Sequence, residues 1–237
     1  MGEKHSGCPT LILMKRALIL VEGQTEERFV KDVLQEHFWT MDLAVNCTII
    51  STKREISGGK SRGGLSGFGK FANDLKRLIY QSAGNALVTT MLDYYRLPND
   101  FPGMTDRPAG SARDRVRHVE QRIHQHFGSP LHFLSHLSLH EFESLLFCSP
   151  AEMSVTLTQP NLEARFAEIR ASFATPEEIN ETPNQSPSKR IEAIAPFYRK
   201  TLHGPSTAKR IGLTTLRQEC PHFNAWINSL EGYALSP

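Results

Sequence analysis

Residues 17–30 read ALILVEGQTEERFV, and this stretch decides the fold that we expect. The apolar run at 17–21 stops abruptly at Glu22, which is typical of a buried parallel strand followed by a turn. Thr25 then has the chemistry of a helix N-cap, and apolar residues recur after it at helical spacing. The stretch predicts strand, turn and helix, with Glu22 at the carboxyl end of the strand, where ligands of open parallel sheets collect.

Further apolar runs predict the rest of the sheet. Residues 44–51 (AVNCTIIS) and 86–92 (ALVTTML) predict a second and a third strand, and the third ends on Asp93. Residues 131–137 have apolar side chains at alternate positions and predict a fourth strand, followed by a short amphipathic helix at 139–147. Strands that alternate with helical patterns predict an α/β fold with a central parallel sheet of about four strands flanked by helices.

The segments between the strands are of two kinds. Helical patterns occupy residues 71–83 and 111–127, and the proline-containing segment 94–110 predicts a loop. Residues 57–70 (SGGKSRGGLSGFGK) are rich in glycine and basic residues. They lack the spacing of a phosphate-binding P-loop, so we interpret them as a mobile basic loop.

Beyond Pro150, short helical patterns alternate with proline-rich breaks. We therefore expect an α/β domain at residues 16–150, a small helical subdomain at 151–237 packed on it, and a flexible leader at 1–15. The sequence CPHFNAW places Phe223 and Trp226 most simply in the core of the helical part. The expected C-terminal helices cover residues 161–172, 176–180, 188–194, 207–218 and 223–231.

Composition excludes several classes of protein. At 39% hydrophobic and 22% charged residues, the chain has the make-up of an ordinary globular protein. No apolar run reaches the roughly 18–20 residues that a membrane span needs. The apolar patch at residues 11–14 is too short for a signal peptide, so we expect a cytoplasmic protein.

Cysteine and histidine usage argues against a zinc site and against disulfides. The cysteines are scattered without a CxxC pair, which in a cytosolic chain favours buried free thiols. His124 and His126 have HxH spacing, but no cysteine or carboxylate is placed near them as a zinc site requires.

Basic residues are unevenly distributed although the net charge is only +2. They concentrate at residues 53–77 and 186–237. Any single Lys or Arg there is best explained as part of a solvated surface. Two basic stretches that bracket an acidic pocket are, however, a pattern that attracts a phosphate backbone.

The acids at the strand ends are the candidates for chemistry. A carboxylate where an apolar strand ends is costly unless a cation or hydrogen bonds satisfy it. Glu22 and Asp93 are expected at the same sheet edge, and such a pair suits Mg²⁺, with Glu141 or Glu143 as further ligands. The alternative is that Glu22 caps the following helix and Asp93 begins a loop.

A resemblance favours the metal interpretation. Residues 18–30 resemble the first motif of the TOPRIM domain, in which a Glu follows the first strand and an Asp motif follows the third. Glu22 and Asp93 match these positions. The segment HEFESLLF, with Glu141 and Glu143, resembles the acidic segment of OLD-type nucleases. After Arg16, the ordered set of motifs is similar to an uncharacterised bacterial TOPRIM-like family of unknown function.

The resemblance implies a Mg²⁺- or Mn²⁺-dependent endonuclease that cleaves DNA or RNA. It implies an effector of anti-phage defence that works with an ABC-type or AAA-type ATPase, away from membranes, and it is compatible with a homo-oligomer. The implied catalytic residues are Glu22, Asp93, Lys189 and Lys200, the metal ligands Glu22, Asp93, Glu141 and Glu143, and the nucleic-acid contacts Lys60, Arg62, Lys70, Arg190 and Arg199.

One departure from the TOPRIM pattern leaves alternatives open. The usual DxD is absent, because Tyr94 and Tyr95 follow Asp93, and Asp100 could replace the second acid only if its loop folds back. A single metal, or a site assisted by the later glutamates, remains an alternative to two metals. A non-catalytic binding or assembly module, or a hydrolase of small phosphate esters, is the alternative to a nuclease. Tyr94, Tyr95 and Phe101 could stack on a base or simply pack the loop.

Overall fold

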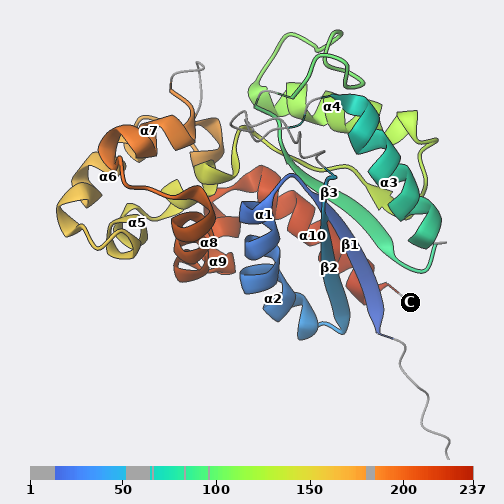
Figure 1. Ribbon diagram of the computed structural model, residues 1–237, viewed down its shortest axis with the longest axis horizontal. Coiled ribbons are helices and arrows are strands. Elements are labelled where there is room, and N and C mark those ends of the chain that lie inside the picture. Colours follow the sequence, from blue (N-terminus) through green and yellow to red (C-terminus); the bar gives the residue numbers. More distant parts are fainter. Residues whose placement is uncertain are drawn as a thin grey trace, which may run out of the picture.

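A parallel β-sheet lies at the centre of the molecule (Figure 1). The computed structural model describes residues 14–51, 65, 67–82, 84–95, 97–179 and 185–236. The strand order is β2-β1-β3-β4, with β5 also paired to β3, and all pairs are parallel. The expected α/β fold with about four strand positions is confirmed. The strands are β1 (Lys15–Val21), β2 (Leu43–Ile49), β3 (Leu87–Asp93), β4 (Phe133–Leu134) and β5 (Leu137–Ser138).

The fourth strand position is divided into two short pieces. β4 pairs with β3 at Val88, and β5 pairs with it at Leu92, but the chain leaves the ladder between them. There the hydroxyl of Thr90 donates to the carbonyl of His136 at 2.7 Å and accepts from its N–H at 2.9 Å. The continuous strand expected at 131–137 is thus interrupted, because a side chain of β3 replaces the backbone partner.

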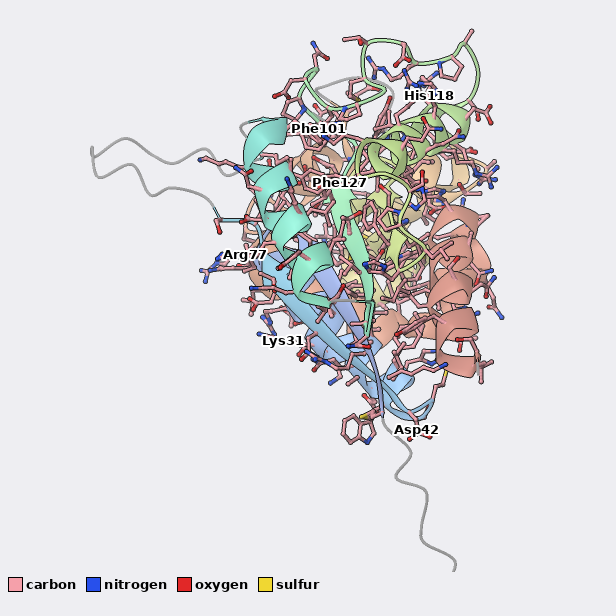
Figure 2. The ribbon with its side chains drawn as sticks, turned by 90° about the vertical axis from the view of Figure 1, so that its right-hand side faces the viewer. Lys31, Asp42, Arg77, Phe101, His118 and Phe127 are labelled. Carbon is pink, nitrogen blue, oxygen red and sulfur yellow. The ribbon has the colours of Figure 1, made fainter. Side chains whose placement is uncertain are left out.

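The two faces of the sheet are covered by different helices. Ile19 and Val21 face two helices. One is the N-terminal helix, which runs through α1 (Gln24–Phe29), η1 (Val30–Leu34) and α2 (Gln35–Trp39), and the other is α10 (Pro221–Leu235). Leu20 and Leu92 point to the opposite face, which α3 (Phe68–Ser82) and α4 (Ala112–His126) cover. Figure 2 shows α3 and α10 on opposite sides of the strands. The alternation of β1 thus places apolar side chains in two separate cores.

The turn after β1 is tighter than expected. The helix cap is Gly23, not Thr25, and the Glu26 carboxylate accepts the Gly23 N–H at 2.9 Å. The helix then continues without a break to Trp39, with one π-helical stretch at Val30–Leu34. Such stretches occur frequently at functional sites.

Aromatic side chains pack the loop after β3 against α3. Phe101 is buried, and its ring centroid lies 5.0 Å from that of Phe68 and 5.1 Å from that of Phe71. Phe101 and Phe127 are labelled on this side of the molecule in Figure 2. The packing interpretation is confirmed for Phe101. Helix α3 begins at Phe68, so the end of the expected basic loop is helical, whereas residues 52–64 and 66 lie outside the described residues.

The chain after Ser149 is helical and joins the core of the sheet. Phe166, Ile191 and Ile227 share one buried cluster with Ile19 and Phe29, and α8 lies beside α1 (Figure 1). Among the described residues, no helix is both long and apolar enough to cross a membrane. The elements are α5 (Pro150–Thr156), η3 (Pro160–Leu162), α6 (Glu163–Ala171), η4 (Pro176–Glu178), α7 (Pro187–Ile194), α8 (Lys200–Ile211) and α9 (Leu213–Glu219).

Helix α8 differs from the helix expected at 207–218. It begins at Lys200, contains Pro205, and ends at Ile211, just before Gly212, whose φ of +80° is readily adopted by glycine. A proline inside a helix leaves a carbonyl of the preceding turn without its partner. Here the Thr201 carbonyl accepts a hydrogen bond from Nη1 of Arg28 at 3.0 Å, so α1 satisfies the group that Pro205 leaves free.

Candidate metal centre at the carboxyl edge of the sheet

The carboxyl ends of β1 and β3 bring acidic side chains together. The register pairs Val21 with Met91, so Glu22 follows β1 at the level where β3 reaches Asp93. The Asp93 backbone forms a hydrogen bond with the Glu22 carboxylate. Glu22 and Asp93 are joined by Glu26, Glu141 and Glu143, and the charges of these four glutamates all act on Asp93.

Asp93 is fixed by the segment that supplies the later glutamates. Its Oδ1 accepts the N–H of Phe142 at 2.9 Å, at the start of η2 (Phe142–Cys148). The N–H groups of Tyr94 and Tyr95 donate to the carbonyls of Ser138 and His140 at 3.0 and 2.9 Å. These bonds hold the end of β3 against the chain on both sides of Glu141.

Glu141 is oriented by the beginning of α7. Its Oε2 accepts the N–H of Ser188 at 2.9 Å, and its Oε1 accepts the Ser188 hydroxyl at 3.1 Å. All three groups are buried. A carboxylate held at both oxygens has a fixed direction, which is what a preorganised site requires.

Glu143 is the most deeply buried of the glutamates and faces Lys200. Its side chain is 2% exposed, and its Oε1 lies 3.2 Å from Nζ of Lys200, the first residue of α8. The contact is an ion pair without hydrogen-bond geometry, and this oxygen has no hydrogen-bond partner among the described residues. The Glu143 carboxylate also acts on the buried hydroxyl of Tyr198, and burial, followed by the charge of Glu143, raises the pKa of that hydroxyl well above its usual value.

The electrostatics of the cluster disfavour five negative charges. Burial, and then the charges of Glu22 and Glu26, raise the pKa of Asp93 well above its usual value. Burial raises the pKa of Glu26 to about 7 and that of Glu143 to about 7. Burial also raises the pKa of Glu22, although a hydrogen bond from the Asp93 backbone and the charge of Lys200 oppose it. At neutral pH the cluster must keep protons or gain a cation.

The residues present fit a hard divalent cation. Mg²⁺ and Mn²⁺ take carboxylate oxygens, and Mg²⁺ keeps several of its own waters. The acids expected from the sequence, Glu22, Asp93, Glu141 and Glu143, are brought together, and Oε1 of Glu143, the oxygen that faces Lys200, belongs to this set. Lys200 is the cation whose charge acts on both Glu22 and Glu143.

The sequence placed Glu26 only in the first turn of the helix after Glu22, where the helix dipole favours acids. Its position in the turn that directly follows Glu22 is the signal that could have found it. Ser188 carried no such signal, since its contact with Glu141 joins segments that are distant in sequence.

The other expected site residues lie outside the cluster. Lys189 is exposed and pairs with Glu192 at 2.6 Å. Arg190 donates to the Gln185 carbonyl at 2.7 Å and lies over the ring of Phe173.

The remaining expected basic residues lie at the surface or outside the described chain. Lys70 is exposed in the first turn of α3, and Arg199 is exposed next to Lys200. Lys60 and Arg62 lie outside the described residues. Asp100 does not join the acids, because its Oδ2 accepts the N–H of Phe68 at 2.9 Å and so caps α3.

Fold and site together define an α/β protein with an acidic centre at the carboxyl edge of a parallel sheet. The chain belongs to the DUF4276 family, described as a domain of unknown function, whose family model matches residues 21–231. This confirms the expectation of an uncharacterised family. No curated protein matches the chain.

One solved structure similar to the chain is the C-terminal region of the Burkholderia pseudomallei OLD protein. The two are 18% identical, and the alignment covers 92% of this chain and 98% of that one, with a TM-score of 0.43. So low a TM-score carries no argument about activity.

Proposed function

We propose that this protein is a Mg²⁺- or Mn²⁺-dependent nuclease of the TOPRIM and OLD type that hydrolyses phosphodiester bonds in DNA or RNA. The observation that supports it is the convergence of Glu22, Asp93, Glu141 and Glu143 beside Lys200. Buried acids with raised pKa values are typical of functional sites, and a structural role for this many adjacent carboxylates would cost stability.

The residues divide into metal ligands and a cation. Glu22, Asp93, Glu141 and Glu143 would hold the ion, and Glu22 could instead act as general base. A bound Mg²⁺ ion supplies an acidified water and stabilises charge on a phosphoryl group. Lys200 is half exposed, so its ammonium can reach a phosphate while it remains beside Glu143. A fixed positive charge at this position would stabilise the negative charge that develops in the transition state.

A cavity with basic side chains lies on the segment that leads to the acids. It has a volume of about 730 Å³ and is lined by Arg113, Arg115, Glu178 and His140, the residue before Glu141, although none of the four acids lines it. Charge-assisted hydrogen bonds from arginine are suited to phosphate oxygens. Within the proposal, Lys189 remains a second catalytic cation, and Lys60, Arg62, Lys70, Arg190 and Arg199 remain contacts to flanking phosphates.

A role in anti-phage defence with an ABC-type or AAA-type ATPase belongs to the proposal as well. Its support is the resemblance of VEGQTEE and HEFESLLF to OLD-type nucleases. Co-purification of the chain with an ATPase would test this part separately from catalysis.

Purified protein incubated with supercoiled plasmid or with RNA tests the proposed reaction. With Mg²⁺ or Mn²⁺ we expect cleavage, and the Glu22→Gln variant should be at least about 100-fold slower, since removal of one electrostatic group commonly costs that much. The matched control is Glu168→Gln, which removes an exposed acid from α6. Cleavage that survives in Glu22→Gln would contradict the assigned site. An absence of both Mg²⁺ or Mn²⁺ binding and cleavage of either polymer would favour the assembly module instead.

A further inference from the structure

A second cluster of metal-ligating side chains lies where the fourth strand is interrupted. His136 occupies the break between β4 and β5, Glu120 projects from α4, and His222 comes from the first turn of α10. The cluster joins three elements that are far apart in the sequence, and none of its members belongs to the acidic centre described above.

The ligand atoms are close to one another. Oε1 of Glu120 lies 3.0 Å from Nε2 of His222 and 3.6 Å from Nδ1 of His136, and all three atoms lie within 4.8 Å of one another. Zn–N and Zn–O bonds of about 2.0–2.2 Å place neighbouring tetrahedral ligands roughly 3.3 Å apart. Small movements of the side chains would bring the three atoms to that separation.

The surroundings fix the two imidazoles and leave space beside them. Trp226 is stacked on His136, with ring centroids 4.4 Å apart and an angle of 5° between the planes. Nε1 of Trp226 is held by the Thr89 hydroxyl at 2.9 Å. A cavity of about 140 Å³ opens next to both histidines, and the Ser135 hydroxyl that lines it is buried without a hydrogen-bond partner in the described chain.

We propose that Nδ1 of His136, Nε2 of His222 and Oε1 of Glu120 form a binding site for a Zn²⁺-class divalent cation, independent of the acidic centre. Two imidazoles and one carboxylate are a common zinc ligand set, which leaves one coordination position for water. The 140 Å³ cavity provides room for that water.

Hydrogen bonds do not fully explain how the ring nitrogens of His136 and His222 are placed around Oε1 of Glu120. A proton on Nε2 of His222 is shared between Oε1 of Glu120 at 3.0 Å and the carbonyl of Leu137 at 3.1 Å. The same Oε1 already accepts the Leu137 N–H at 2.8 Å. Nδ1 of His136 lies too far from this oxygen for a hydrogen bond. A cation in place of the proton would bind Nε2 of His222 and Nδ1 of His136 at the same time.

The two imidazoles respond to their surroundings in opposite ways. Burial, and then the charge of His222, lower the pKa of His136. Burial also disfavours the charged form of His222, but the hydrogen bond to Glu120 outweighs it and raises the pKa of that ring, so a cation must displace a proton there. The charged groups facing the site are Glu120 from α4, Glu177 from η4 and Arg117, which lines the same cavity.

Cobalt binding monitored through Trp226 tests the site. The sequence contains two tryptophans, so Trp39→Phe leaves Trp226 as the sole tryptophan, which can be excited selectively at 295 nm. Asp93→Asn is added so that the acidic centre does not contribute. In this background Co²⁺ should quench the fluorescence with a stoichiometry of one, develop the visible absorption of a low-coordinate cobalt site, and be displaced by Zn²⁺.

Two conservative variants and one control complete the experiment. His222→Gln keeps a donor for the Leu137 carbonyl, and Glu120→Gln keeps an acceptor for the Leu137 N–H, so both should fold. Each should weaken Co²⁺ binding at least about tenfold, because even indirect partners of metal ligands have effects of this size. The control is His118→Gln, also on α4 and labelled in Figure 2, which removes the solvent-accessible histidine that pairs with Asp106. It should bind Co²⁺ as the background does.

Two results would overturn the inference. One is an absence of saturable quenching by Co²⁺ at millimolar concentration in the folded background protein. The other is equal affinity in the background and in a folded His222→Gln variant, with folding checked by circular dichroism. Neither result bears on the nuclease, because the background lacks Asp93, and a failure of the plasmid assay would leave cobalt binding unaffected.

Discussion

At the scale of single residues, Asp93 is held in a position that its own charge disfavours. Oδ1 is fixed by the Phe142 N–H at 2.9 Å, and burial together with the charges of Glu22 and Glu26 raises its pKa well above the usual value. A buried carboxylate beside other carboxylates carries a desolvation cost and a repulsion that an amide of the same shape avoids. The proposed role as a metal ligand would account for an aspartate at this position.

We expect Asp93→Asn to stabilise the metal-free protein at pH 8 by about 1–3 kcal/mol and to abolish most of its Mn²⁺ affinity. The asparagine oxygen still accepts the Phe142 N–H, while the repulsion among the carboxylates falls. Urea denaturation in the presence of a chelator measures the first effect, and calorimetry measures the second. Asp106→Asn is the control, since Asp106 is exposed and pairs with Arg122 and His118, and its Mn²⁺ binding should be unchanged. A less stable Asp93→Asn variant would contradict the account.

At the scale of elements, the position of Lys200 depends on how closely α8 approaches its neighbours. A Cβ on Gly204 would lie 3.2 Å from Cε1 of Phe142 and 3.2 Å from the Tyr198 hydroxyl. Glycine at this position therefore allows α8 to pack against η2, which carries Glu143. The contact between Lys200 and Glu143 follows from that packing.

Gly204→Ala should destabilise the protein by about 1–3 kcal/mol through overpacking and weaken Mn²⁺ binding by displacing η2. The matched control is Gly232→Ala in α10, where a Cβ meets no atom within 4 Å. That variant should gain about 0.5–1 kcal/mol, because alanine is the better helix former. Thermal and urea unfolding of both variants provide the comparison. The two variants should change the free energy of unfolding in opposite directions. A stabilised Gly204→Ala variant would show that α8 packs against η2 less closely than the structure indicates.

The strand interruption gives a second prediction at this scale. Thr90→Val keeps the shape of the side chain but leaves the N–H and the carbonyl of His136 without partners. The cost should be about 2 kcal/mol, the usual penalty for unsatisfied buried polar groups. Thr156→Val, which removes only a bond to a carbonyl within its own helix, should change stability much less. Equal unfolding midpoints for the two variants would mean that Thr90 does not hold the break.

The sequence was most informative where local pattern and structure coincide. The apolar runs of β1, β2 and β3, and the acids at the ends of β1 and β3, could be predicted, because each depends on neighbouring residues and on the rule for parallel sheets. The division of the fourth strand could not, since it depends on the Thr90 hydroxyl of another strand. The start of α8 was missed because Pro205 normally argues against a helix, and its compensation by Arg28 is a long-range contact.

At the scale of the whole molecule, the acidic cluster should govern how stability depends on pH. Glu26 and Glu143 ionise near pH 4.5 in the unfolded chain, and each has a folded-state pKa of about 7. Between these values the folded protein binds more protons than the unfolded chain, so stability falls as the pH rises through this window. Above pH 7 the full penalty is present.

Metal-free protein should therefore lose about 3 kcal/mol per such carboxyl group between pH 4.5 and pH 8. Glu26→Gln should remove the part of this pH-dependent loss that comes from Glu26. Because the histidines titrate equally in both proteins, the difference in unfolding free energy between variant and wild type isolates that part. Saturating Mn²⁺ should flatten the profile, since the ion binds the ionised form. Urea unfolding at several pH values measures the profile. A difference in unfolding free energy between Glu26→Gln and wild type that does not change with pH would contradict the assigned pKa shifts.

The histidine cluster shows what the sequence could not supply at this scale. The HxH pair at His124 and His126 drew attention to α4, but the members of the cluster come from α4, the strand break and α10. Only the folded chain brings Glu120, His136 and His222 together. Glu22, Asp93, Glu141 and Glu143 could be predicted, by contrast, because each ends or follows a strand at the same sheet edge.

The central claim is that the carboxylates at the end of β1 and β3 hold a divalent cation. The most direct test is a crystal structure with Mn²⁺, located by its anomalous scattering. The account predicts a peak bound by Glu22 and Asp93, with Glu141 or Glu143 as a further ligand. A structure with saturating Mn²⁺ at pH 8 that shows no peak among these side chains would contradict it.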